Sequence, residues 1–158
     1  MTDLNFAIIG CGRIGLRHAQ HISNNGKLVA VCDVDSKKAE ELGKQYSANT
    51  FYNIDDFLGS NIKADIVSIC TPNGLHAEHS IRCLEAGYNV LCEKPMSLSA
   101  QDCGKMITSA ERANRRLFVV KQNRFNPPVI AVKDLLEKGK LGKVFSIQLN
   151  CFWNRNPE

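Results

Sequence analysis

Residues 10 to 15 read Gly-Cys-Gly-Arg-Ile-Gly, which has the G-x-G-x-x-G spacing of a phosphate-binding loop. The segment follows a short apolar run and precedes an amphipathic stretch, so we expect it to join a strand to a helix. In that setting the first glycine permits a tight turn, the second lets the backbone approach a pyrophosphate, and the third allows close helix–strand packing. Amides at the start of the helix then face the phosphates. The loop predicts a dinucleotide site that includes Gly10, Gly12, Arg13, Ile14 and Gly15, with an ordinary glycine turn as the alternative.

A carboxylate, Asp33, ends the second apolar run, 18 residues after Gly15. At the end of that strand a carboxylate accepts hydrogen bonds from the adenosine ribose hydroxyls and repels a 2′-phosphate. The residue therefore favours NAD over NADP as the cofactor. Lys37 and Lys38 follow and could partly offset this preference, but we expect both to be solvated residues in the first turns of a helix.

Two polar loops follow later apolar runs. The first reads Thr71-Pro72-Asn73-Gly74-Leu75-His76, and the second reads Glu93-Lys94-Pro95. Ligands of open parallel sheets bind outside the carboxyl ends of the strands, so both loops are expected to reach the cofactor. A lysine at a strand tip, partly desolvated and beside a cationic nicotinamide, gives up its proton more readily and suits proton transfer. The alternative for Lys94 is a surface lysine paired with Glu93.

Other polar residues are expected to have structural roles. His18 and His21 are three residues apart but lack an evident third ligand, so we expect no metal site. Asp55 and Asp56 are interpreted as caps of a short helix rather than as an acid–base pair.

These loops must be positioned by strands and helices that alternate along the chain. Such alternation predicts an α/β fold of the Rossmann type, a doubly wound parallel sheet with helices on both faces. The apolar runs interpreted as strands are Asn5–Gly10, Leu28–Asp33, Asp65–Cys70, Asn89–Glu93, Leu117–Gln122 and, more weakly, Thr50–Asn53. The amphipathic stretches interpreted as helices are Arg13–Asn25, Ser36–Tyr46, Leu75–Ala86 and Ser99–Asn114, with Ser36 and Ser99 as start signals.

The pattern changes after Asn126-Pro127-Pro128. A helix over Val129–Lys138 and a half-buried strand over Val144–Trp153 are expected there. A strand of this kind needs a sheet to pair with. We therefore expect residues 1–124 to form an NAD-binding domain and residues 125–158 to begin an incomplete α+β second domain of a longer protein.

Composition narrows the function classes. The chain has 158 residues, a net charge of +4 and 44% hydrophobic residues, as in globular proteins. The charge is too small and scattered to indicate a nucleic-acid partner, and no apolar run reaches the roughly 18 residues of a membrane span. We see no secretory signal, and the seven cysteines lack C-x-x-C spacing. A cytoplasmic protein without disulfides or zinc is therefore expected.

Taken together, the motifs resemble the Gfo/Idh/MocA family of NAD(P)-dependent sugar oxidoreductases. The matching residues are the glycine loop, Asp33, T-P-N-x-x-H at 71–76 and E-K-P at 93–95. The segment Phe118–Pro128, together with Leu149–Arg155, also looks like the UDP-N-acetylglucosaminuronate 3-dehydrogenases of lipopolysaccharide O-antigen synthesis. This resemblance implies oxidation of the C3 hydroxyl of UDP-N-acetylglucosaminuronic acid to a 3-keto sugar, with NAD as the acceptor.

The resemblance also implies roles for individual residues. Lys94 corresponds to the lysine that accepts or relays the substrate proton, and it is expected with Asn123 and Arg124 at the sugar. The other positions expected at the cofactor are Thr71, Pro72, Asn73, His76, Glu93, Lys94 and Gln122.

Further expectations follow for the whole protein. The complete protein is expected to be a homo-oligomer, and this chain alone to bind NAD with little turnover. The alternatives are an inositol or simple-sugar dehydrogenase of the same family and a non-catalytic NAD-binding module.

Overall fold

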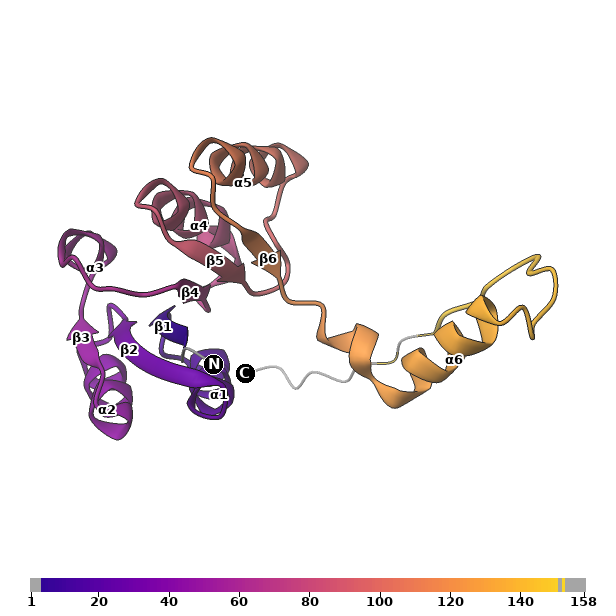
Figure 1. Ribbon diagram of the computed structural model, residues 1–158, viewed down its shortest axis with the longest axis horizontal. Coiled ribbons are helices and arrows are strands. Elements are labelled where there is room, and N and C mark those ends of the chain that lie inside the picture. The colour runs from indigo at the N-terminus through magenta and orange to yellow at the C-terminus, as the bar shows by residue number, and fades with distance from the viewer. Residues whose placement is uncertain (1–3, 151, 153–158) are drawn as a thin grey trace. The chain divides into compact units, whose positions relative to one another are not determined.

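The computed structural model describes residues 4–150 and 152, and its centre is one parallel β-sheet (Figure 1). The strand order is β3-β2-β1-β4-β5-β6, and every neighbouring pair is parallel. From β1 the chain adds β2 and β3 on one side, and it then returns to the other side of β1 to add β4, β5 and β6. The strand order therefore reverses between β1 and β4. The strands are β1 Leu4–Ile9, β2 Gly26–Cys32, β3 Asn49–Phe51, β4 Ile66–Ile69, β5 Asn89–Cys92 and β6 Leu117–Val119.

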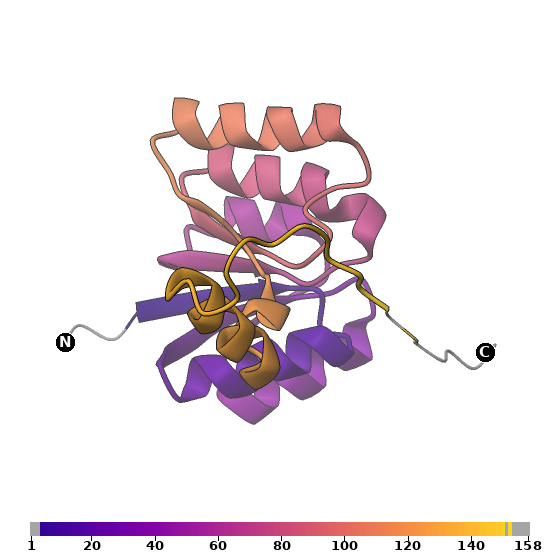
Figure 2. The ribbon, with the colours of Figure 1, turned by 90° about the vertical axis from the view of Figure 1, so that its right-hand side faces the viewer.

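Helices cover both faces of the sheet (Figure 2), which confirms the predicted Rossmann-type architecture. Neighbouring residues of β1 supply the two layers, because Ile8 packs with α1 and α2 while Ala7 and Ile9 pack with α3, α4 and α5. The helices are α1 Arg13–Ser23, α2 Ser36–Tyr46, α3 Ile54–Gly59, α4 His76–Glu85, α5 Ala100–Arg112 and α6 Pro127–Glu137, with 3₁₀ turns η1 Asn73–Leu75 and η2 Gln122–Phe125.

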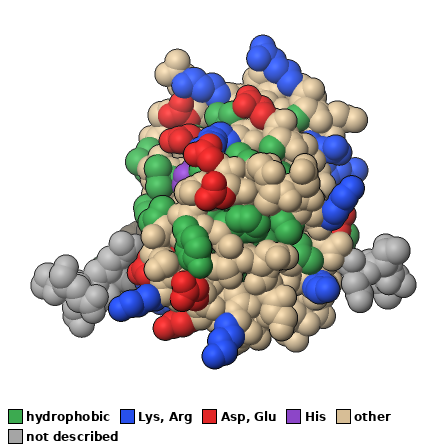
Figure 3. All heavy atoms as spheres, turned by 90° about the vertical axis from the view of Figure 1, so that its left-hand side faces the viewer, with side chains coloured by type: hydrophobic (Ala, Val, Ile, Leu, Met, Phe, Trp, Pro, Cys, Tyr) green, Lys and Arg blue, Asp and Glu red, His purple; other side chains and the backbone are tan. Residues whose placement is uncertain are grey.

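Hydrophobic side chains gather in a band across the face at the β3 edge of the sheet, with acidic side chains above and below it (Figure 3). Residues from this side, Phe51 of β3 and Ile54 and Leu58 of α3, are only partly buried where they pack on the core. The core itself centres on Phe57, whose ring stacks on Tyr88 at 5.5 Å between ring centroids.

Three helix starts show how the local sequence sets the boundaries. Ser99 caps α5 as predicted, since its hydroxyl accepts the Asp102 amide at 3.1 Å. The start signal for α2 was wrong, because Asp35 caps that helix and Ser36 is its first residue. The expected aspartate caps of α3 were also wrong, because Asn53 accepts the Asp56 amide at 2.8 Å. Asn53 is the residue that adopts the extended conformation a cap requires.

Two compact units divide the chain, residues 1–120 and residues 121–158. The second unit holds η2 and α6, and Pro127 and Pro128 occupy the first turn of that helix. The strand predicted over Val144–Trp153 is absent from 144–150, the part of it that the structure describes without a gap. A strand requires a hydrogen-bonded neighbour, and no described strand pairs with this segment. Residues 151 and 153 of that prediction lie outside the described part.

The predicted last strand also ends early, because β6 stops at Val119 and Gln122 begins the 3₁₀ turn η2. None of the described helices is both long and apolar enough to cross a membrane.

Candidate functional site

The glycine loop between β1 and α1 is shaped by two close backbone contacts. Gly10 has φ +99°, a left-handed conformation, and a Cβ there would lie 2.6 Å from the carbonyl carbon and oxygen of Cys70. Its amide donates to the Cys32 carbonyl at 2.8 Å. A Cβ on Gly15 would overlap the Gly10 carbonyl oxygen. These two glycines are therefore required by packing between the helix and the strands.

Gly12 differs from its two neighbours in the motif. It caps α1 with φ −74° and ψ −169°, an ordinary extended conformation, and a Cβ built on it meets nothing within 4 Å. The fold therefore does not require glycine at this position. The open side of the backbone, next to the first amides of α1, suits a pyrophosphate that approaches closely.

The Asp33 carboxylate is tied to this loop. Its Oδ2 accepts the Cys11 amide at 2.6 Å, and its Oδ1 accepts the Asp35 amide at 2.8 Å. Each carboxylate oxygen has a second lone pair, so the group can still accept hydrogen bonds from ribose hydroxyls. Asp33 thus holds the loop in position and presents acceptors where a ribose is expected.

A cleft of about 590 Å³ runs past these residues at the carboxyl ends of β1, β2 and β4. The predicted residues that line it are Gly10, Gly12, Arg13, Ile14, Asp33, Thr71 and Pro72. The cleft is also lined by Leu75, from the polar loop expected to reach the cofactor, and by Val34, Asn53, Ile54 and His79, which were not predicted. Val34 and Asn53 each lie two residues after the end of a strand, so the rule that ligands bind at strand ends would have found them.

A histidine, His79, also lines the cleft. Burial lowers the pKa of His79, and its Nδ1 has no hydrogen-bond partner among the described residues. No pattern in the sequence singles out this residue. Lys38 pairs with Asp35 at 2.8 Å, and this pairing raises the pKa of the lysine. Lys38 lines the cleft as well, but its ammonium already has a carboxylate partner.

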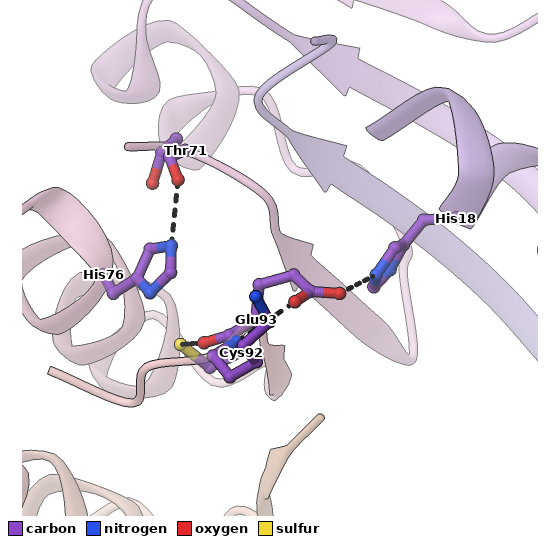
Figure 4. A network of polar contacts seen from close by, with 6 residues as sticks. His18, Thr71, His76, Cys92 and Glu93 are labelled. Atoms are coloured by element: carbon purple, nitrogen blue, oxygen red, sulfur yellow. Dashed lines mark hydrogen bonds and ion pairs between the residues drawn. The ribbon is translucent and has the colours of Figure 1, made fainter. Parts of the chain in front are cut away.

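Lys94 follows β5 and is exposed, whereas its neighbour Glu93 is largely buried. Glu93 does not pair with the Lys94 ammonium. Its Oε1 lies 3.0 Å from His18 Nε2, and its Oε2 accepts the Lys94 backbone amide at 3.1 Å (Figure 4). Among residues 4–150 and 152, no carboxylate forms an ion pair with Lys94. The side chain is therefore free to meet a substrate.

His76 begins α4 and is buried, with 1% of its surface exposed. Its Nδ1 lies 2.7 Å from the Pro95 carbonyl oxygen and its Nε2 lies 2.8 Å from the Thr71 carbonyl oxygen. The ring therefore joins the two polar loops behind the cleft and is not part of the cleft wall. Contact of His76, Asn73, Glu93 or Lys94 with the cofactor stays a prediction.

The remaining predicted residues belong to the second unit. Gln122, Asn123 and Arg124 lie in the 3₁₀ turn η2. Their expected position near the cofactor and the sugar stays a prediction. Within the described part of the chain, no group of three His, Cys, Asp or Glu side chains is arranged to hold a metal ion.

Comparison with known proteins agrees with this geometry. The model of the Gfo/Idh/MocA oxidoreductase family, NAD-binding Rossmann fold, matches residues 4–121. D-glucoside 3-dehydrogenase of Escherichia coli K12 is 31% identical over 147 residues, which are 91% of this chain and 42% of the relative. Inositol 2-dehydrogenase of Rhizobium meliloti is 32% identical over 98% of this chain and 46% of the relative. The chain thus spans less than half the length of these relatives.

Solved structures give the same picture. The WlbA dehydrogenase from Bordetella pertussis, in complex with NADH and UDP-GlcNAcA, superposes with a TM-score of 0.82 at 35% identity, covering 89% of this chain and 43% of that one. Myo-inositol 2-dehydrogenase from Lactobacillus plantarum has a TM-score of 0.81 at 32% identity, covering 90% of this chain and 43% of that one. Nucleotide-sugar and inositol dehydrogenases are therefore about equally similar to this chain.

Proposed function

Because the chain belongs to the Gfo/Idh/MocA family of oxidoreductases and carries its NAD-binding Rossmann domain, we propose that it is the cofactor-binding part of a sugar or polyol dehydrogenase. The observation that carries this proposal is the arrangement at the carboxyl ends of the strands. Gly12 leaves room for a pyrophosphate, Asp33 presents acceptors for a ribose, and the exposed Lys94, just after β5, forms no ion pair with a carboxylate of residues 4–150.

Each group of residues in this chain would have a separate role in binding the cofactor or in the reaction. The amides of the glycine loop and α1 would bind the phosphates, and Asp33 would select NAD over NADP by repelling a 2′-phosphate. NAD, when bound, supplies a nicotinamide that accepts a hydride from the carbon of an alcohol. Lys94 would accept the hydroxyl proton of that alcohol, which is the general-base role in the same oxidation.

For the substrate we propose UDP-N-acetylglucosaminuronic acid, oxidised at its C3 hydroxyl as a step of lipopolysaccharide O-antigen synthesis. Support comes from the 35% identity with a dehydrogenase solved with UDP-GlcNAcA and from the Phe118–Pro128 segment. An inositol or simple-sugar dehydrogenase is the second candidate, since those relatives match at 31–32% identity. In either case the complete protein is proposed to act as a homo-oligomer.

The decisive experiment measures NADH formation by the complete protein. We expect turnover with UDP-N-acetylglucosaminuronate and none with UDP-N-acetylglucosamine, which lacks the carboxylate. Turnover of myo-inositol or a glucoside in its place would select the second candidate. Calorimetric titration with NAD and NADP tests the cofactor preference separately, and tighter binding of NADP would contradict the role of Asp33.

Two controls address the remaining alternatives. Lys94→Ala in the complete protein is expected to reduce turnover by about 10²-fold or more, as for loss of a general base. Unchanged turnover would remove the role of Lys94, and NAD binding without turnover of any alcohol would favour a non-catalytic binding module. This 158-residue chain alone is expected to bind NAD but to turn over little substrate.

A further inference from the structure

The loop Glu93–Lys94–Pro95, which we call the Lys94 loop, is held on both sides by histidines from different helices. On its N-terminal side His18 of α1 contacts Glu93 Oε1 at 3.0 Å, although the two residues are 75 positions apart in the sequence. The other oxygen of the same carboxylate accepts the Lys94 amide at 3.1 Å. His18 is therefore connected to the Lys94 backbone through one side chain.

On its C-terminal side the loop is held by His76 of α4. The Pro95 carbonyl oxygen lies 2.7 Å from Nδ1, and the Thr71 carbonyl oxygen lies 2.8 Å from Nε2. A carbonyl oxygen only accepts hydrogen bonds, and a ring with a single N–H donates to one of these two oxygens, depending on its tautomer. The buried ring therefore lies between the Lys94 loop and the loop that follows β4 and contacts both.

The side chains that support the Lys94 loop are largely buried, whereas Lys94 itself is exposed. The side chains of His18 and Glu93 are 12% and 13% exposed, and His76 is 1% exposed, whereas Lys94 is exposed. Hydrogen bonds shielded from water are stronger than exposed ones, so the partly buried contacts of the two histidines hold the residues on either side of Lys94, whereas the hydrogen bond of the Lys94 amide is exposed. Figure 4 shows His18 directed at Glu93 and His76 directed at Thr71.

We propose that His18 and His76 are positioning residues that hold Lys94 in place from its two neighbouring residues. His18 acts through the Glu93 carboxylate, and His76 acts through the Pro95 carbonyl. The inference rests on the proposed role of Lys94 in proton transfer for its consequence in the reaction, but the positioning itself is a property of this chain. A small displacement of a catalytic group lowers the rate strongly, so supporting residues of this kind are expected to affect kcat.

The positioning is tested without any substrate. In the 158-residue chain, His18→Leu removes the donor to Glu93, His18→Gln keeps an N–H donor on a side chain of similar reach, and His21→Leu is the matched control on the same helix. Amide exchange measured by NMR is expected to be about tenfold or more faster for the Lys94 amide in His18→Leu. It is expected to be near wild type in His18→Gln and unchanged in His21→Leu.

Two outcomes would overturn the role of His18: an unchanged Lys94 exchange rate in His18→Leu, or the same acceleration in His21→Leu. Should His18→Leu fail to fold, Glu93→Met breaks the same contacts from the other side and is expected to give the same acceleration. For His76, ring nitrogen shifts from ¹⁵N NMR are expected to show a proton on Nδ1, the nitrogen 2.7 Å from the Pro95 carbonyl oxygen. An Nδ1 without a proton would overturn the action of His76 through Pro95.

Turnover by the complete protein then tests the consequence for the reaction. His18→Leu is expected to lower kcat about tenfold while leaving the KM for NAD within about threefold, and His18→Gln is expected to restore kcat. A wild-type protein without turnover of any tested alcohol would refute the proposed function and leave the exchange result to decide the positioning. A His18→Leu protein with wild-type kcat would refute the effect on the reaction.

Discussion

The glycines at positions 12 and 15 belong to the same motif, but the structure predicts opposite consequences for replacing them with alanine. A Cβ on Gly12 meets no atom within 4 Å, and the backbone there is in a conformation that alanine adopts freely. Gly12→Ala is therefore expected to change the free energy of unfolding by less than about 1 kcal/mol, because the weaker helix cap is partly offset by a less flexible unfolded chain. Its effect is expected on NAD binding alone.

The magnitude for binding follows from the amides at the start of α1. A methyl group on the open side of Gly12 holds a pyrophosphate away from these donors. A hydrogen bond to a charged group contributes about 1.5–3 kcal/mol, so losing one weakens NAD binding by roughly 10- to 150-fold.

Gly15→Ala has a different expected result. Its Cβ overlaps the Gly10 carbonyl oxygen, which is backbone and cannot rotate away. Overpacking of this kind costs about 1–3 kcal/mol in the free energy of unfolding. For a chain of this size each kcal/mol lowers the unfolding temperature by roughly 2–4 °C.

Calorimetry measures both quantities, as the unfolding temperature and as the affinity for NAD at 15 °C. We expect Gly12→Ala to unfold like the wild type and to bind poorly, and Gly15→Ala to unfold at a lower temperature. A Gly12→Ala protein that binds NAD with wild-type affinity would refute the placement of the pyrophosphate. A Gly15→Ala protein with unchanged stability would refute the packing argument.

Three further predictions concern the fold around the site. Burial raises the pKa of Cys11, Cys32 and Cys83 from 9.0 to about 12, so these thiols lose their protons above pH 9 only when the chain unfolds. The unfolding temperature is therefore expected to fall as the pH rises from 8 to 10. An unfolding temperature that does not change over this pH range would contradict the prediction. Ser99→Ala removes the cap of α5 and is expected to cost about 1 kcal/mol in a denaturant titration, whereas Ser36→Ala, at an exposed first helical position that does not cap α2, is the control. His76→Leu removes the ring donor from a carbonyl oxygen, Pro95 or Thr71, and is expected to destabilise the chain by about 1–3 kcal/mol, with the partly exposed His79→Leu expected to cost less.

Much of the fold and the strand–loop–helix setting of the glycine motif was predictable because the relevant signals are local. The glycine spacing, the carboxylate at Asp33 and the alternation of apolar and amphipathic segments each depend on neighbours within one strand–helix unit. The contact between His18 and Glu93 was not predictable in this way, since it joins α1 to the end of β5 only after the sheet has assembled. The same limit explains why His79 was missed on the cleft wall.

In residues 144–150 the local pattern indicated a strand that the structure does not contain. Residues 144–150 alternate in polarity as a strand does, yet the structure gives them no regular conformation. Side-chain pattern indicates which face of a strand would be buried, but the backbone hydrogen bonds must come from another strand. A prediction from pattern alone therefore identified a segment suited to a sheet without establishing its partner.

Asp33 accepts the Cys11 amide and is also proposed to bind the adenosine ribose, and this combination has a consequence for redesign. Replacing it by a small neutral residue to admit a 2′-phosphate would also strip the Cys11 amide of its acceptor. Engineering a switch to NADP is therefore expected to need paired changes, one that accommodates the phosphate and another that supplies a substitute oxygen for the bend between β1 and α1. Libraries that vary position 33 alone would mostly return proteins with a distorted bend and poor affinity for both dinucleotides.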